Sequence, residues 1–302
     1  MNRRAKRRPG RNLRVGTTFG ALIALAAGLS GCSGDEPSRA AKATPPARST
    51  PAEGAAISGL FSVNEHKLFL NCSAGTSPAV VFVADLTRTG DDGDLLAARL
   101  PDDRRFCRYD RAALGVSTAA SSADLGTPTT GADAVSDLHE LLRVAGVPRP
   151  VVLVGAGYGG LVATMHAATH PDDVAGLVLA GPLLPDEWDL LDHVPAKDAR
   201  AVEQAWEGNS EHVAVRRTLA QAKALAVTVP DVPMVLIDAH YEESPAGWDW
   251  KAIRAAHSRQ LRAFAGAFPD HQVIRSDSEA PLENEAPEEV VAQVKTVLAE
   301  LG

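Results

Sequence analysis

The sequence predicts an α/β fold in which a mostly parallel β-sheet is flanked by helices on both faces. Short unbroken runs of β-branched and other apolar residues recur along the chain, as strands that are buried on both faces require. Segments with apolar residues at helical spacing separate these runs, and a parallel sheet needs such helices as its crossover connections. About 245 residues follow the N-terminal region, enough for one large domain with a full core.

The elements are expected in a regular order along the chain. Alternating apolar residues in FSVNEHKLFLNC (61–72) predict a hairpin at the edge of the sheet. Apolar residues three and four apart predict a helix between Thr130 and Gly146, and Gly146 ends it. The other expected elements are strands 79–85, 104–110, 150–155, 174–181, 232–239 and 271–275, helices 158–169, 249–267 and 287–301, and a mostly helical segment 183–229.

The first 31 residues have the pattern of a secretory signal peptide. Seven basic residues and no acidic one precede the apolar run VGTTFGALIALAAGLSG, which is too short and too rich in small residues to predict a membrane span. Cys32 follows, and the tail LSGC resembles the lipobox of bacterial lipoproteins. That resemblance implies cleavage before Cys32, an acyl lipid on its thiol and an extracytoplasmic protein anchored to the outer face of the cell membrane. A plain secretory signal and an uncleaved amphipathic segment are the alternatives.

Residues 32–57 are rich in Pro, Ala, Ser and charge, which predicts a disordered tether before a folded domain at 58–302. With the seven cations of the leader set aside, 23 basic and 38 acidic residues remain, a net charge of −15. Such a charge disfavours nucleic acid as a partner and also disfavours electrostatic docking on anionic lipid. A lipid anchor, at about 0.8 kcal/mol per buried methylene, would therefore hold the protein at the membrane.

The stretch VVLVGAGYGGLVATMHAATHP (151–171) contains G-x-G-x-x-G between a predicted strand and a predicted helix. A dinucleotide site also needs an acidic residue about 20 residues further on, at the tip of the next strand. That strand ends in LVLAGPLLP, which has no carboxylate, and the motif lies in the middle of the chain rather than at its start. The sequence therefore predicts no dinucleotide site, and we expect no cofactor.

From about Phe61 to Leu298 the chain resembles the α/β-hydrolase family, and within it an exported branch of actinobacterial type. The segments LNCSAG (70–75) and CRYDRAALGVS (107–117) match that branch. DLHELLRVAGVPRPVVLVG and ATHPDDVAGLVLAGP match the stretches that flank the family's nucleophile turn. The resemblance implies an α/β-hydrolase fold in which residues 183–229 form a short helical cap or lid.

The resemblance also shows that two catalytic side chains are missing. The family places a serine at the centre of G-x-S-x-G, in a strained turn between strand and helix. The matching residue here is Gly157, which has no side chain, and Tyr158 follows it. Aligning the Pro-Glu before the last helix puts Ala280 at the place of the family's histidine. Nucleophile and base are both absent, and losing either typically reduces turnover on the order of a millionfold.

The acid and the oxyanion turn are also altered. The family's spacing favours Glu242 as the acid, with Asp238 and Glu243 as alternatives. Asp85 lies where the oxyanion donors are expected, and its negative charge would oppose a developing oxyanion. We therefore expect a catalytically inactive protein that binds a small molecule or a protein through the former cleft, made roomier by Ala156, Gly157 and Ala280 and made acidic by Asp85 and Glu242. An active ester or acyl hydrolase with relocated groups around His240 and Glu242 is the alternative.

Two further features follow from the side chains. Cys72 and Cys107 remain once Cys32 is assigned to the lipid, and a disulfide is expected in an oxidising compartment, although two buried thiols are the alternative. His166 and His170 have the i, i+4 spacing that can bind metal. Only Asp172 is near them in sequence, so no metal site is expected.

Overall fold

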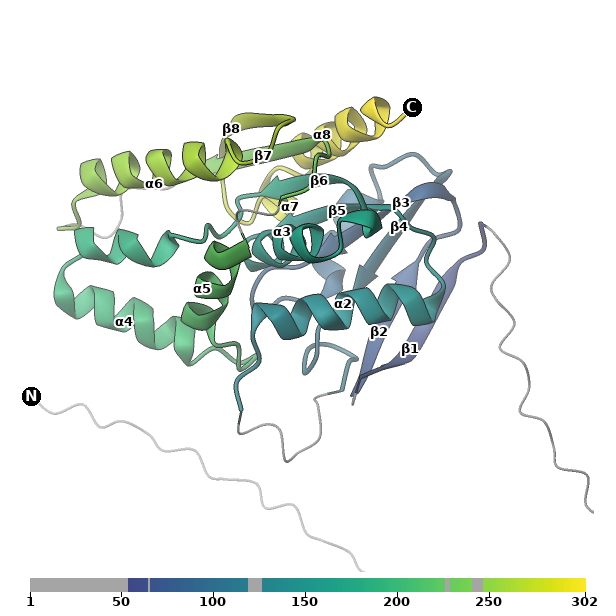
Figure 1. Ribbon diagram of the computed structural model, residues 1–302, viewed down its shortest axis with the longest axis horizontal. Coiled ribbons are helices and arrows are strands. Elements are labelled where there is room, and N and C mark those ends of the chain that lie inside the picture. The colour runs from purple at the N-terminus through teal and green to yellow at the C-terminus, as the bar shows by residue number, and fades with distance from the viewer. Residues whose placement is uncertain (1–53, 65, 119–126, 226–228, 241–246) are drawn as a thin grey trace, which may run out of the picture. The chain divides into compact units, whose positions relative to one another are not determined.

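An eight-stranded β-sheet organises the folded part of the protein (Figure 1). The computed structural model describes residues 54–64, 66–118, 127–225, 229–240 and 247–302. The strands are β1 (Ile57–Val63), β2 (His66–Cys72), β3 (Thr76–Val83), β4 (Arg104–Tyr109), β5 (Val151–Ala156), β6 (Val174–Ala180), β7 (Met234–His240) and β8 (His271–Glu279). The predicted strands are confirmed, with shifts at their ends.

The strand order is β1-β2-β4-β3-β5-β6-β7-β8. β1 pairs antiparallel with β2 and β2 with β4, so the predicted hairpin lies at the edge of the sheet. From β4 onward every neighbouring pair is parallel. β5 therefore lies in the middle of the sheet, and its carboxyl end carries the glycine-rich turn.

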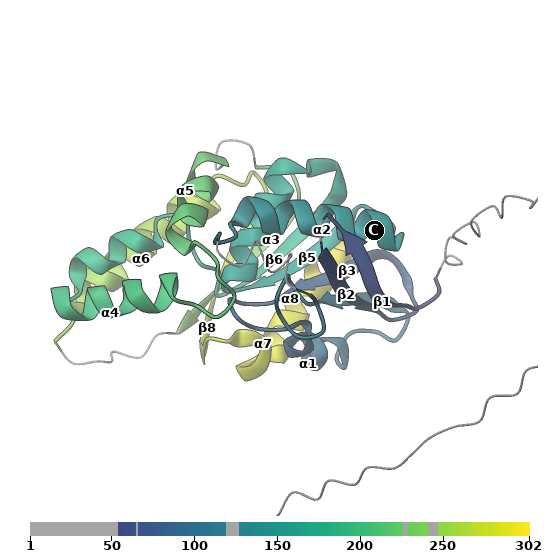
Figure 2. The same ribbon diagram turned by 90° about the horizontal axis from the view of Figure 1, so that it is seen from below.

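Helices cover both faces of the sheet (Figure 2). They are η1 (Gly90–Gly93), α1 (Asp94–Ala97), α2 (Gly131–Ala145), α3 (Tyr158–Thr169), η3 (Pro171–Asp173), η4 (Glu187–His193), α4 (Ala196–Glu207), α5 (Val215–Leu225), α6 (Trp250–Ala265), α7 (Leu282–Glu285) and α8 (Pro287–Glu300). Alternate residues of β3 face the two layers: Val81 and Val83 join the core under α2 and α3, whereas Val80 and Phe82 join the core under α8. The predicted α/β fold is therefore confirmed.

α2 shows why its bounds could be predicted. Thr130 is its N-cap, and the Asp133 carboxylate accepts hydrogen bonds from the Thr130 backbone N–H at 2.7 Å and hydroxyl at 2.8 Å. Gly146 follows the last turn with φ of +68°, a conformation that glycine adopts at low cost.

At their carboxyl ends, β3 and β8 differ from the predicted bounds by more than the other strands do. β3 ends at Val83, two residues before the predicted end, because the chain turns at Asp85 to form the loop over the glycine-rich turn. β8 continues to Glu279, four residues beyond the predicted end, because it stays paired with β7 as far as His240. The polar sequence at the end of β8 concealed this extension.

A disulfide joins Cys72 and Cys107, as expected. The two cysteines face each other across the antiparallel pair of β2 and β4. They close a loop with a sequence separation of 35 residues, which stabilises the fold by about 4 kcal/mol in the chain-entropy view.

The predicted cap at 183–229 contains η4, α4 and α5, and residues 226–228 lie outside the described part. Among the residues that the structure describes, no helix has the length and apolarity needed to cross a membrane. The predicted leader and Cys32 lie outside the described residues.

Candidate functional site

The turn between β5 and α3 has the backbone shape of a nucleophile turn. Gly157 has φ of +49° and ψ of −118°, a strained conformation that only glycine adopts easily. Gly155 and Gly159 let strand and helix approach closely, since a Cβ on either would lie 2.6 Å or less from neighbouring backbone atoms. Gly155 and Gly157 of the G-x-G-x-x-G motif, together with Gly159, thus serve the packing of this turn.

The carboxylate of Asp85 occupies the position of an oxyanion. Its Oδ1 accepts hydrogen bonds from the backbone N–H of Tyr158 at 2.6 Å and of Leu86 at 2.7 Å. In α/β-hydrolases the N–H of the residue after the nucleophile and an N–H from the loop after the third strand are the oxyanion donors. Both donors are therefore already bound to an anion that belongs to the chain.

The same carboxylate fills the space of the missing side chain. A Cβ built on Gly157 would lie 2.0 Å from Asp85 Oδ1 and 2.2 Å from its Cγ. Burial raises the pKa of Asp85, while the hydrogen bonds from Tyr158 and Leu86 and the charge of Arg111 oppose that rise. The expectation that Gly157 makes the cleft roomier is wrong, because Asp85 occupies the space.

A buried ion pair holds the Asp85 loop in place. The guanidinium of Arg111 donates to Glu211 Oε1 at 2.6 Å and Oε2 at 2.9 Å, and to the Asp85 backbone oxygen at 2.6 Å. Glu211 Oε2 also accepts from the Thr87 N–H at 2.8 Å. Both side chains are about 95% buried, at 5% and 4% exposure, and Arg111 lies over the ring of Tyr158. This pair therefore connects the cap, the loop after β3 and the turn before α3.

Ala280, at the place of the family's histidine, and Ala156 were both expected to make the cleft roomier. Ala280 is exposed, and its Cβ lies 3.8 Å from the position of a Cβ on Gly181. Ala156 is 1% exposed and belongs to the core on the α8 side of the sheet. Neither residue enlarges the cleft, so that part of the expectation is wrong as well.

A buried carboxyl that the sequence did not single out lies on α7. Glu283 is fully buried, and with the residues that the structure describes neither of its oxygens makes a hydrogen bond of standard geometry. Its pKa is raised to about 7, mainly by burial and to a smaller degree by the charges of Asp85 and Asp92, while its own backbone N–H and the charge of Arg88 oppose the rise. Glu283 is therefore a member of the acidic run 277–289 that belongs to the interior.

An open cleft of about 750 Å³ lies beside the closed turn. It lies between the cap, α6 and the carboxyl ends of β7 and β8, and it is lined by residues that include Trp206, Trp248, Trp250, Glu187, Asp238 and His257. Trp248 and Trp250 stack with ring centroids 5.2 Å apart. The indole N–H of Trp248 donates to Asp198 on α4 at 3.1 Å, which attaches this wall to the cap.

A histidine–carboxylate pair lines this cleft. His257 Nε2 lies 3.0 Å from Asp238 Oδ1, and both side chains are mostly buried. Burial lowers the pKa of His257, but the hydrogen bond to Asp238 and the charge of Glu187 outweigh it, so the pKa is raised. Burial raises the pKa of the Glu187 carboxyl. Asp238, expected only as an alternative acid, is therefore paired with a histidine that the sequence did not single out.

The residues that a relocated hydrolase would use, and the loop serine Ser117, lie in different places. His240 ends β7, is exposed and lines the cleft. Glu242 and Glu243 lie outside the described residues. The Ser117 hydroxyl donates to the Asp110 carbonyl at 2.7 Å and accepts from the Phe69 N–H at 2.8 Å, so it supports the edge of the sheet.

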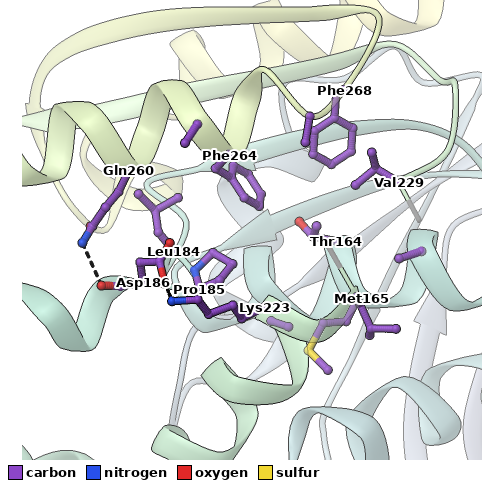
Figure 3. Close-up of a pocket in the computed structure, with 15 residues that line it drawn as sticks. Thr164, Met165, Leu184, Pro185, Asp186, Lys223, Val229, Gln260, Phe264 and Phe268 are labelled. Carbon is purple, nitrogen blue, oxygen red and sulfur yellow. Dashed lines mark hydrogen bonds and ion pairs between the residues drawn. The ribbon is translucent and has the colours of Figure 1, made fainter. Parts of the chain in front are cut away.

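A smaller cavity of about 180 Å³ lies between α3, α5 and α6 (Figure 3). Its wall is mostly apolar, with Met165, Phe264 and Phe268 among the side chains that face it. Gln260 donates to the Asp186 carbonyl at 2.8 Å, and Lys223 pairs with the Asp186 carboxylate. None of the side chains that line this cavity forms a catalytic arrangement, so we do not include it in the candidate site.

The predicted histidine pair on α3 has more neighbours than the sequence showed. His139 of α2 and Asp173 of η3 join His170 in a cluster whose ligand atoms lie within 4.8 Å of one another. His166 Nε2 lies 3.9 Å from Asp173 Oδ2. Burial, together with smaller effects of His170 and His139, lowers the pKa of His166 to about 4, and the charge of Asp173 opposes this change. The sequence offered only Asp172 as a neighbour of the pair, whereas the structure brings His139 and Asp173 to it.

Comparisons with known proteins agree with this architecture. The family model described as alpha/beta hydrolase fold matches residues 93–231. The uncharacterized protein YqjL of Bacillus subtilis is 22% identical over 179 residues, which span 59% of this chain and 68% of that protein. A proline iminopeptidase of Xylella fastidiosa is 29% identical over 134 residues, which span 44% of this chain and 42% of that enzyme.

Solved structures share the fold at low sequence identity. The alpha/beta hydrolase domain-containing protein 10 from mouse superposes with a TM-score of 0.57 and 14% identity, over 81% of this chain and 99% of that one. The matched family model and the solved structures show that this chain has the α/β-hydrolase fold.

Proposed function

We propose that this protein is a catalytically inactive α/β-hydrolase-like lipoprotein that binds a small ligand in the cleft beside its closed nucleophile turn. The observation that carries the proposal is the carboxylate of Asp85. It occupies the nucleophile's space and binds both oxyanion donors. Acyl transfer at this turn needs a nucleophile, a base and free donors, and the residues that the structure describes offer none of the three there.

The chemistry of the cleft supports a cationic or polyhydroxy ligand. Trp206, Trp248 and Trp250 offer aromatic faces, which attract cations and pack against sugar rings. The carboxylates of Glu187 and Asp238 add acceptors for ammonium or hydroxyl groups. A volume of about 750 Å³ is within the range of small-molecule sites.

The binding half of the proposal is tested by thermal unfolding against a panel of quaternary ammonium compounds, polyamines and oligosaccharides. A bound ligand at a hundred times its Kd adds about 2.7 kcal/mol to the free energy of unfolding. We expect a rise in Tm that Trp250→Ala abolishes and that Trp188→Ala, outside the cleft, retains. A panel without any shift would argue against the cleft as a binding site.

The inactive half is tested by hydrolysis of short-chain activated esters. We expect the protein to match the buffer background. A second candidate function, an active hydrolase with relocated groups, has the Asp238–His257 pair in its favour. Activity that disappears in His257→Ala or in His240→Ala, with the fold intact, would establish that alternative and overturn the inactive reading.

Membrane attachment is a separate part of the proposal. Membership of the exported, actinobacterial-type branch of the family is proposed with it. Seven leader cations, the apolar run and LSGC before Cys32 support a lipid-anchored protein at the outer face of the cell membrane. We expect the protein in the membrane fraction of cells that express the full chain. Cys32→Ala should release it, and a variant that stays in the membrane would contradict the anchor.

A further inference from the structure

Four metal-ligating side chains converge at the end of α3 that is remote from Gly157. His139 Nδ1 lies 2.7 Å from Asp173 Oδ2, and the rings of His139 and His170 stack with centroids 4.0 Å apart. The ring of His166 lies 5.1 Å from that of His170 and 6.3 Å from that of His139. Residues from α2, α3 and η3 therefore meet at one place.

His166 is the member whose position calls for an explanation. Its side chain is 0% exposed, and neither ring nitrogen makes a hydrogen bond of standard geometry with the part of the chain that the structure describes. The Val135 backbone raises the pKa of His166 slightly, against the larger effect of burial. A buried polar group without a partner costs about 1–3 kcal/mol. Nε2 lies 3.9 Å from Asp173 Oδ2, so the ring is directed into the cluster. An ion there would give the buried nitrogen its missing partner.

The carboxylate of Asp173 is held in position for such a role. Arg149 donates a hydrogen bond to its Oδ1 at 2.7 Å, and its Oδ2 faces the histidines. A hydrogen bond from a neighbouring side chain of this kind orients ligating carboxylates in metal sites. Asp173 is 7% exposed, so its direction is set by the fold.

We propose that His139, His166, His170 and Asp173 form a binding site for a Zn²⁺ ion. Three imidazole nitrogens and one carboxylate oxygen suit Zn²⁺ better than hard cations, which prefer all-oxygen ligands. Tetrahedral ligands at about 2.0–2.1 Å from zinc lie roughly 3.4 Å apart. The ligand atoms of His139, His170 and Asp173 already lie within 4.8 Å of one another, so rotation of the stacked rings is the main adjustment.

The consequence of ion binding is structural. The ligands join α2 to α3 and to the turn before β6. His166 is more than two helical turns from Gly157 along α3, so the ion would stabilise the helical layer without contacting either the closed turn or the cleft. The site is independent of the proposed ligand and of the inactive turn.

The test is titration of the metal-free protein with ZnCl₂ in a calorimeter, with MgCl₂ as the comparison cation. We expect one Zn²⁺ per chain, no heat from Mg²⁺, and a higher Tm in the presence of zinc. His139→Gln and His170→Gln should each weaken binding about tenfold or more. Substitution with Co²⁺ should give the intense visible absorption of a tetrahedral ion.

His212→Asn is the matched control. His212 is exposed and has φ of +56°, which asparagine tolerates, so the variant removes one imidazole without strain. Circular dichroism identifies variants that fold. Absence of zinc binding, or binding that folded His139→Gln and His170→Gln retain at full strength, would overturn the proposed site.

Discussion

The nucleophile turn and the cap cleft lie at the carboxyl edge of the same sheet, yet one is filled and the other is hollow. At the turn, Asp85 binds the donors and Arg111 with Glu211 holds the loop. In the cleft, aromatic and charged side chains surround about 750 Å³ of space. The difference shows that loss of catalytic groups need not enlarge an old active site, because a neighbouring side chain can fill it.

The largest expected effect concerns the ion pair that holds the closed turn. Arg111→Ala leaves the Glu211 carboxylate buried without its partner, which typically costs about 3–5 kcal/mol. Urea unfolding measures this loss. Arg108→Ala is the control, because its partners Asp91 and Asp94 are well exposed and such pairs contribute at most about 1 kcal/mol. Equal losses in the free energy of unfolding of the two variants would contradict the claim that the buried pair holds the closed turn.

The next effect is a pH-dependent stabilisation by Glu283→Gln. Because burial raises the pKa of Glu283 from 4.5 to about 7, the folded protein binds a proton that the unfolded chain has released. Ionising Glu283 in the folded protein therefore costs free energy of unfolding. This cost is absent below pH 4.5, grows as the pH rises toward 7 and is complete above pH 7. We expect the variant to be more stable by roughly 2 kcal/mol at pH 8 and nearly unchanged at pH 4.5. The exposed Glu285→Gln is the control, and a pH-independent difference would contradict the buried charge.

A smaller effect tests the electrostatics of the cleft. Asp238→Asn removes the hydrogen-bonded carboxylate that raises the pKa of His257. We expect that pKa to fall, as measured by following the imidazole resonances of His257 through a pH titration. Asp277→Asn, which removes another carboxylate on the cleft lining, should leave it nearly unchanged. A pKa of His257 that is insensitive to Asp238 would exclude the pair as a functional unit.

Much of the fold and part of the turn could be predicted from the sequence. Strand and helix periodicity and the caps at Thr130 and Gly146 are local, so they could be read from neighbouring residues. The family resemblance implied that Gly157 and Ala280 stand at the places of the nucleophile and the base. The role of Asp85 as an opposing charge could also be predicted, but the hydrogen bond from Tyr158 could not, because 73 residues separate the two.

The unpredicted features depend on contacts between distant segments. Arg111 and Glu211 are 100 residues apart, and nothing near either residue indicates its partner. His257 lies on a helix that reads as amphipathic and meets Asp238 only through packing. Glu283 lies within an acidic run, and only the fold of α7 against the sheet buries it.

Serine-reactive labelling tests most directly the claim that Asp85 closes the nucleophile turn. The comparison is Gly157→Ser with Ala280→His, with and without the additional change Asp85→Ala, each treated with a fluorescent phosphonate. We expect little labelling while Asp85 fills the serine's space and binds the donors, and clear labelling once it is removed. Equal labelling of the two folded variants would contradict the account, since Asp85 would then leave the turn open.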